Sequence, residues 1–311
     1  MAQTLPFDAP LGKDAGPAGA SPAPPRPLAP SGRRSLLAGR LGYHLLLAPA
    51  ALLLLTFYIL PVVRVLWISV VEPHPGLGNY AELASPPVRH VLTTTAAICT
   101  LTTTITVLLA YVVAYAITHC GRITRRLLML GVILPLWISV LVRSIAWVAL
   151  LRRQGVVNST LLQLGIIHQP LALIWNELGV TIGMVHYMLP YGILPLVANM
   201  RLIDPSFTTA ARGLGASPVQ AFRRIFLPLS LPGVIAAGVL VFIFSLGFYA
   251  TPVLLGGGKV IMVTEYISSQ IMNVLDWGTG TMLATTMVAT VLVLLVLLSR
   301  AADLRQVFGA K

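Results

Sequence analysis

Six long stretches of the chain consist almost entirely of apolar residues, and polar segments separate them. A helix that crosses a bilayer needs about 20 mostly apolar residues in a row, and each stretch comes close to that length or exceeds it. Strict alternation of apolar and polar positions, which marks membrane β-barrels, is missing, so helices are expected. The pattern predicts an all-α integral membrane protein with six transmembrane helices, at residues 45–70, 91–117, 127–151, 178–198, 231–255 and 281–299.

The composition also points to a membrane protein. Of the 311 residues, 57% are hydrophobic and 10% are charged, and the mean hydropathy is +0.87, whereas soluble domains carry about 25% charged residues. The net charge of +12 could indicate a nucleic-acid partner, but the positions of the charges favour another explanation. With the N-terminus in the cytoplasm, fifteen Lys and Arg fall in inner segments and four in outer segments. This positive-inside bias predicts two cytoplasmic termini and no nucleic-acid partner.

The polar segment between the fourth and fifth spans begins with the signals of a short helix. Asp204 followed by Pro205 is an N-cap with proline at the first helical position. Gly213 and Gly215 then offer a C-terminal stop, because glycine adopts the left-handed backbone that ends many helices. We therefore expect a helix of about two turns that faces the cytoplasm.

A second helix start follows at once. Ser217 is a capping residue, Pro218 stands at the first helical position, and Gln220 lies three residues after the cap, as in a capping box. We expect this second helix to end at Pro228 and Pro232, since proline does not continue a helix without a kink. A structured helix–turn–helix on the cytoplasmic side of a membrane protein is typical of a docking surface.

The chain contains no motif that could power transport by itself. The glycines at 256–258 and Lys259 could be mistaken for a phosphate loop, but Walker A needs a further glycine at the position of Val253. The spans hold no series of Asp, Glu or His that could relay protons. His186 alone lies mid-span, and we interpret it as a hydrogen-bonded core residue. The energy for any transport must come from a partner.

The polar segment resembles the "EAA" docking loop of permease subunits of binding-protein-dependent ABC importers. The family pattern is Glu-Ala-Ala, three residues, Gly, nine residues and Ile-x-Leu-Pro, and this chain departs from it at Thr209, where the family has glutamate. The resemblance implies a type I ABC importer permease fold. It also implies that residues 199–230 dock on an ATPase subunit, with the contact residues Asp204, Thr209, Ala210, Ala211, Gly215, Ala216, Ser217, Phe222, Arg223, Ile225, Leu227 and Pro228.

Further stretches are similar to the spermidine/putrescine class of these permeases, among them GLGNY at 76–80, LPLWISVLVR at 134–143 and TPVLLGG at 251–257. This similarity implies that the substrate is a polyamine or a related small organic cation. Acidic and aromatic side chains suit an ammonium group, because aromatic faces attract cations. The candidate pathway residues are Trp175, Glu177, Tyr187, Tyr191, Phe248, Tyr249, Glu265 and Asp276. Each also has an ordinary structural interpretation, such as anchoring a helix at the headgroup level.

The resulting hypothesis is a non-enzymatic permease subunit in a bacterial inner membrane. Residues 1–40 are expected to form a disordered cytosolic tail and residues 41–311 the six-helix permease domain. The resemblance implies four partners: a cytosolic ABC ATPase dimer, a second permease subunit, an extracytoplasmic substrate-binding protein and membrane lipid. No cofactor or metal is expected on this chain, with ATP and Mg on the ATPase. The alternatives are an ion-coupled secondary transporter and, third, a structural membrane scaffold.

Overall fold

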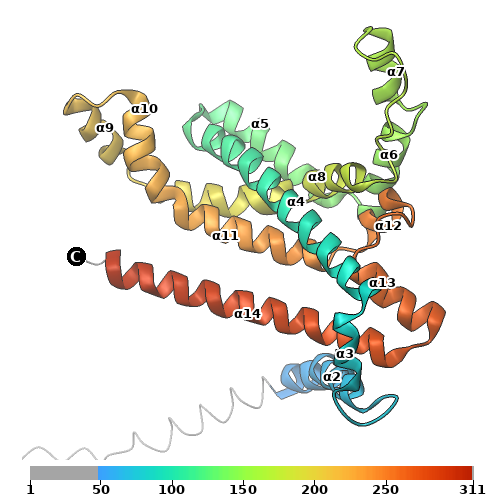
Figure 1. Cartoon of the computed structure of the whole chain (residues 1–311). Helices are drawn as coiled ribbons and strands as arrows, with labels where there is room; N and C mark the ends of the chain where they lie inside the picture. Colours follow the sequence, from blue (N-terminus) through green and yellow to red (C-terminus); the bar gives the residue numbers. More distant parts are fainter. Residues whose placement is uncertain (1–47, 310–311) are drawn as a thin grey trace, which may run out of the picture. The chain divides into compact units, whose positions relative to one another are not determined.

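The computed structural model describes residues 48–309, and the side chains of residues 48–297. Within this range almost all residues are helical (Figure 1), which confirms the predicted all-α class. The chain divides after Tyr58 into two units. The described residues of the first unit, 48–58, are all helical, and the last four of them belong to the π turn η1 (Leu55–Ile59). The predicted tail, residues 1–40, lies outside the described residues.

The second unit, which starts at Ile59, alternates long helices with short ones. The long helices are α2 (Leu60–Val71), α4 (Pro86–His119), α5 (Arg122–Ile133), α6 (Val140–Leu151), α8 (Glu177–Met200), α11 (Leu227–Leu246) and α14 (Trp277–Gly309). The short elements are α3 (Gly78–Ala81), η2 (Glu82–Ala84), η3 (Leu134–Trp137), α7 (Val156–Gln163), α9 (Pro205–Gly213), α10 (Pro218–Ala221), η4 (Phe222–Phe226), α12 (Ala250–Gly256), α13 (Val263–Ser269) and η5 (Gln270–Val274).

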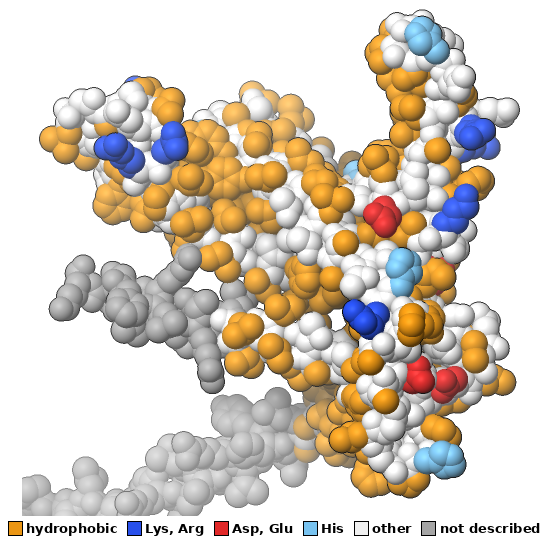
Figure 2. Space-filling view, viewed as in Figure 1, with side chains coloured by type: hydrophobic (Ala, Val, Ile, Leu, Met, Phe, Trp, Pro, Cys, Tyr) orange, Lys and Arg blue, Asp and Glu red, His pale blue; other side chains and the backbone are white. Residues whose placement is uncertain are grey.

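Five described helices are long and apolar enough to cross a membrane, namely Ala48–Val71, Pro86–His119, Glu177–Met200, Pro218–Leu246 and Trp277–Leu297. A sixth crossing is complete if Arg122–Trp137 and Val140–Gln163 form one broken span. Large apolar side chains such as Leu108, Val112 and Trp137 are exposed on these helices, and Figure 2 shows hydrophobic side chains over much of the visible helical surface. Such a surface suits contact with lipid.

The predicted third span, residues 127–151, is not one continuous helix. The helix pair that covers it is bent by 102°. The break follows the 3₁₀ turn η3, which contains Pro135, and the backbone of Ile138 and Ser139 is extended. Because proline has no backbone N–H to donate, the helical series of hydrogen bonds is interrupted at Pro135. The second half, α6, therefore leaves in a new direction.

The prediction that Pro228 and Pro232 end the second polar helix is also wrong, because the helix continues to Leu246. The ring of Pro228 would collide with the carbonyl group of Arg224 in a regular helix. Arg224 lies inside the π turn η4, where the helix is wider. The fifth span accordingly begins upstream of residue 231. It ends at Leu246 rather than residue 255, since α12 is a separate helix.

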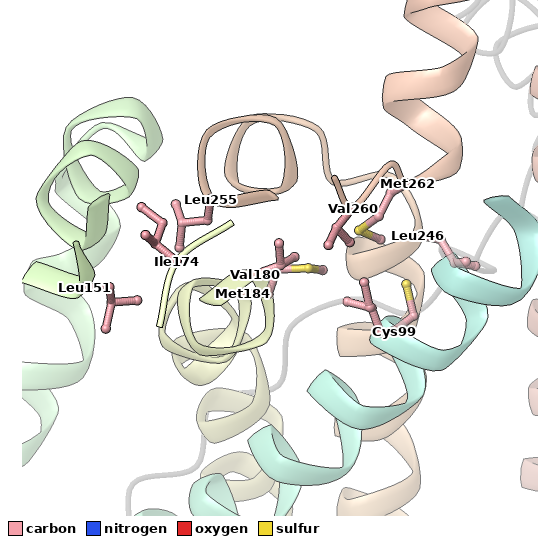
Figure 3. Close-up of a cluster of buried hydrophobic side chains, with 10 residues drawn as sticks. Cys99, Leu151, Ile174, Val180, Met184, Leu246, Leu255, Val260 and Met262 are labelled. Atoms are coloured by element: carbon pink, nitrogen blue, oxygen red, sulfur yellow. The ribbon is translucent and has the colours of Figure 1, made fainter. Parts of the chain in front are cut away.

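Helix α8 lies between α4 and α11 and packs against both. The contact is close because Gly192 has no side chain: a Cβ there would lie 3.1 Å from the Cβ of Ala110 and 3.3 Å from a methyl carbon of Thr106. Small residues permit such approaches between membrane helices. Near the start of α8, around Val180 and Met184, side chains of α4, α6, α8, α11 and α12 form one apolar cluster (Figure 3).

Candidate functional site

The first helix of the polar segment is capped at both ends as the sequence predicts. Asp204 Oδ1 accepts a hydrogen bond of 2.8 Å from the backbone N–H of Ser206. Hydrogen bonds from Ser206 hold the pKa of the Asp204 carboxyl below its usual value. At the other end Gly215 has φ +90°, and the N–H groups of Gly215 and Ala216 donate to the carbonyls of Arg212 and Ala211. These two bonds form a Schellman motif, in which Gly215 takes the left-handed position.

The second helix begins with a complete capping box. Ser217 Oγ accepts from the backbone N–H of Gln220 at 3.3 Å, and Gln220 Oε1 accepts from the backbone N–H of Ser217 at 3.0 Å. The two caps fix where each helix starts, so the turn between them has a defined shape. The predicted helix–turn–helix is confirmed in both halves.

Aromatic contacts connect this segment to the membrane helices. The ring of Tyr115 on α4 meets the edges of Phe222 and Phe226, with centroids 5.5 and 5.3 Å apart. Tyr111, one turn earlier on α4, forms a hydrogen bond of 2.9 Å with Ser230 on α11. These contacts pack the segment after the turn against α4 and α11.

The predicted docking residues lie on a partly exposed surface at one end of the unit, around α9 and α10 (Figure 1). Sequence reasoning missed its most exposed large apolar side chains. Leu214 is 91% exposed in the turn, and Phe207 and Val219 also expose more than half of their area. No local signal reveals them, because their exposure depends on which distant parts of the chain pack nearby. Exposed apolar residues of this kind mark contact surfaces.

Three of the predicted pathway residues form an aromatic cluster. The ring of Tyr187 on α8 lies 4.4 Å from that of Phe248 and 5.9 Å from that of Tyr191, between centroids. Tyr191 in turn packs edge-on against Phe244 on α11, at 4.9 Å. All four side chains keep part of their surface accessible, so the cluster lines an accessible face of the unit and is not sealed in its core.

A buried arginine already occupies the ring face of Tyr187. Arg143 on α6 is only 8% exposed, and its guanidinium carbon lies 4.2 Å from the centre of that ring. Its Nε and Nη1 atoms have no hydrogen-bond partner among residues 48–297, so the ring is the main group that holds the charge. Sequence reasoning did not select Arg143 as a site residue. A charged residue inside an apolar span is the signal that indicates it.

His186 lies beside this cluster, and its interpretation as a hydrogen-bonded core residue is confirmed. The indole Nε1–H of Trp147 donates to Nδ1 of His186 at 3.2 Å. Because an indole nitrogen can only donate, Nδ1 accepts and the ring proton lies on Nε2. Arg143, on the same helix as Trp147, lies close to this pair.

The other predicted pathway residues occupy separate places. Glu177 lies in the first turn of α8, and Tyr249 precedes α12 with 47% of its surface exposed. Asp276 caps α14 by accepting from the N–H of Thr279 at 3.0 Å. Glu265 on α13 has one carboxylate oxygen buried without a partner, and burial raises the pKa of its carboxyl.

Trp175 packs against the glycine turn that follows α12. Its backbone N–H donates to the carbonyl of Leu255 at 2.8 Å, and its ring lies over Gly257. The predicted turn at the glycines is confirmed, since Gly257 and Gly258 both have positive φ. Transport roles for all eight predicted pathway residues, in the aromatic cluster and away from it, remain predictions.

Comparison with known proteins decides the family. A family model described as "Binding-protein-dependent transport system inner membrane component" matches residues 106–304, more than half of the chain. The match covers the docking segment, the aromatic cluster and the last span. The chain belongs to this family. It is therefore a multi-pass permease subunit of the inner membrane, as the docking-loop motif indicates.

Individual relatives agree with this assignment. The permease is 33% identical over 222 residues to the spermidine/putrescine transport system permease protein PotB of Escherichia coli K12, which covers 71% of this chain and 80% of PotB. It is 33% identical over 204 residues to PotB of Haemophilus influenzae, covering 66% and 71%. A crystal structure of a bacterial alginate ABC transporter, in complex with an alginate pentasaccharide-bound periplasmic protein, matches the fold with TM-score 0.73 and 18% identity over 89% of this chain and 98% of that chain.

Proposed function

We propose that this permease forms one half of the translocation pathway of an ATP-driven importer for polyamines or similar small organic cations. A second permease subunit supplies the other half, a cytosolic ATPase dimer binds ATP and Mg, and an extracytoplasmic binding protein delivers the substrate. The observation that carries the substrate class is the 33% identity to polyamine permeases over 71% of the chain. The docking segment and the aromatic cluster provide physical support for the two ends of this mechanism.

At the proposed cytoplasmic end, the exposed and capped turn of the docking segment supports a contact with an ATPase. Leu214 and Val219 protrude from a turn whose backbone is fixed by two caps, so they can enter a groove with little loss of conformational entropy. Closure of the ATPase dimer would then push on Phe222 and Phe226, and through Tyr115 on α4. Thr209, in the middle of α9, donates its hydroxyl to the carbonyl of Pro205 at 3.0 Å and lacks the charge of the family glutamate.

At the pathway, the aromatic cluster can take a cation. Arg143 already holds one face of the Tyr187 ring at 4.2 Å, so the other rings of the cluster are the ones open to an ammonium group, a contact worth about 0.5–2 kcal/mol. Tyr191 and Phe248 extend the same surface along α8 and the segment before α12. A flexible chain that carries several ammonium groups could move along these rings without binding one of them too tightly to leave.

Uptake by the reconstituted four-part complex tests the substrate. Proteoliposomes that contain the permease, its second subunit, the ATPase and the binding protein should accumulate radiolabelled spermidine or putrescine. Excess unlabelled amine should compete, and a sugar or a molybdate-like anion should not. Uptake of an anion or sugar without uptake of either amine would reject the substrate class and leave the family assignment intact.

The orientation is tested by cysteine labelling. With Cys120 replaced by serine, single cysteines at Glu82 and Glu265 should react with impermeant reagents added outside, and cysteines at Ile123 and Ser217 should not. The reverse result would contradict the cytoplasmic placement of the docking segment.

The competing hypothesis is an ion-coupled secondary transporter. Such a protein would transport in vesicles without the ATPase and would lose activity when an ionophore collapses the ion gradient. The docking segment favours the importer, because a secondary transporter has no use for a capped apolar turn in the cytoplasm.

A further inference from the structure

A basic pocket lies at the end of the unit opposite to the docking segment. It has a volume of about 480 Å³ between the α6–α7 turn, residues 172–175 and the turn after α12. Basic side chains are visible beside α6 and α7 in Figure 2. We call it the outer basic pocket, and it is lined by Arg152, Arg153, Gln154, Ala172, Ile174, Trp175 and Lys259.

Three cations line this pocket and no acid does. Arg152, Arg153 and Lys259 are all exposed, and within residues 48–297 none of them forms an ion pair. Glu177 follows Trp175 by two residues but pairs with none of the three. Like charges this close repel one another, so their grouping needs an opposite charge from outside the chain to become favourable.

A buried asparagine fixes the two walls of the pocket against each other. Asn158 on α7 is 0% exposed. Its Nδ2 donates to the carbonyls of Leu171 at 3.0 Å and Arg152 at 3.4 Å, and its Oδ1 accepts from the N–H of Leu171 at 2.8 Å. A fully satisfied buried amide of this kind rigidifies its surroundings. The backbone that carries Arg152 is therefore anchored while its guanidinium group stays free to bind.

The tryptophan in the pocket is held in an unfavourable backbone conformation. Trp175 has φ +59°, which is costly for a bulky residue, by about 1–3 kcal/mol. Its N–H bond to Leu255 and the absence of a side chain at Gly257 maintain it, since a Cβ at Gly257 would lie 2.3 Å from a Trp175 ring carbon. Yet 52% of the Trp175 surface is exposed. This strained backbone places the half-exposed indole in the pocket lining beside Arg152 and Arg153.

We infer that the outer basic pocket is the docking site for acidic side chains of the extracytoplasmic binding protein. This inference rests on the proposed function, which gives the permease such a partner and places this end outside. The amine itself is repelled by three cations, and the ATPase lies at the other end. Tryptophan and arginine are the residues that most often dominate protein–protein contacts, and carboxylates pair with arginine through two parallel hydrogen bonds.

The test is the ATPase rate of the full complex against the concentration of amine-loaded binding protein, in nanodiscs made only of neutral lipid. The double variant Arg152→Glu, Arg153→Glu should raise the half-saturating concentration by roughly tenfold or more, because two attractions become repulsions. The maximal rate should stay the same. Lys259→Glu, on another wall of the pocket, should independently raise the half-saturating concentration of binding protein. This variant tests the inference if the double variant fails to fold.

Two controls define the pocket. Arg152→Lys with Arg153→Lys should behave nearly as wild type, and Arg89→Glu, an exposed charge on α4 outside the pocket, should have little effect. An unchanged half-saturating concentration in both the double variant and Lys259→Glu would overturn the inference, and so would an equal effect of Arg89→Glu. An effect seen only when anionic lipid is present would assign the pocket to a lipid headgroup instead. If the binding protein fails to stimulate the wild-type complex at all, the proposed function fails and the inference with it.

Discussion

Replacing Gly215 tests whether the docking turn couples ATP hydrolysis to transport. Gly215 occupies the left-handed position of the Schellman motif with φ +90°, a conformation that costs a residue with a side chain roughly 1–2 kcal/mol. A Cβ at this position meets no atom within 4 Å in the chain itself. Gly215→Ala and Gly215→Leu should therefore lose similar folding stability. They should differ only in how much of the ATPase cleft they fill.

The assay is ATP hydrolysis stimulated by the amine-loaded binding protein, measured beside the amount of inserted permease. We expect Gly215→Ala to retain part of the stimulation and Gly215→Leu to abolish it, with both proteins inserted, because the turn lies outside the membrane spans. The matched control is Gly213→Ala. Gly213 ends α9 without positive φ, and a Cβ there also meets nothing, so alanine should be neutral or stabilise by up to about 1 kcal/mol.

The outcome that refutes this reasoning is a Gly215→Leu permease with full transport and full stimulation. The turn would then tolerate both the strain and the added volume, and the ATPase contact would have to lie elsewhere. Equal loss in Gly213→Ala would be a different failure, since it would show that any change in the segment disturbs the complex.

Three further predictions concern the pathway, the docking helix and the outer end. Tyr191→Phe should keep amine uptake near the wild-type level because the ring remains, whereas Tyr191→Leu should raise the KM for amine up to roughly thirtyfold, the upper end of a cation–π contact. Thr209→Ala should reduce stimulated ATP hydrolysis only modestly, and Thr209→Glu, which restores the family charge at an exposed position of α9, should be tolerated. Burial raises the pKa of Glu265 above its ordinary value of 4.5, so the folded state binds more protons and loses stability as pH rises through that raised pKa. Glu265→Gln should remove this loss: in thermal unfolding the variant should gain on wild type from pH 4 to pH 8, and parallel curves would contradict the assignment.

The docking segment was predictable because its signals are local. Asp204, Gly215 and Ser217 act on backbone groups within five residues, so their roles can be inferred from spacing alone. The helical class was also predictable, because a long apolar segment in a bilayer can hydrogen-bond all its backbone N–H and C=O groups by forming a helix. The exposure of Leu214 was not predictable in this way, because it depends on the absence of neighbours from distant parts of the chain.

The pathway was only partly predictable because its contacts are long-range. Nothing local places Arg143 on the ring of Tyr187, which lies on another helix. The sequence predicted a single helix over residues 127–151 and did not reveal the bend after Pro135. The continuation of the helix through Pro228 depends on a π turn, and sequence spacing does not reveal a change in helical register. These are the places where tertiary packing overrides local propensity.

The central claim is that a partner ATPase drives amine uptake through this permease, and its most direct measurement is the energy source for that uptake. Proteoliposomes with the full complex and the loaded binding protein should accumulate radiolabelled spermidine or putrescine when ATP is enclosed. A non-hydrolysable analogue should give none, and an ionophore that collapses ion gradients should leave the rate unchanged. Uptake that persists with the analogue and disappears with the ionophore would contradict the account and identify an ion-coupled transporter.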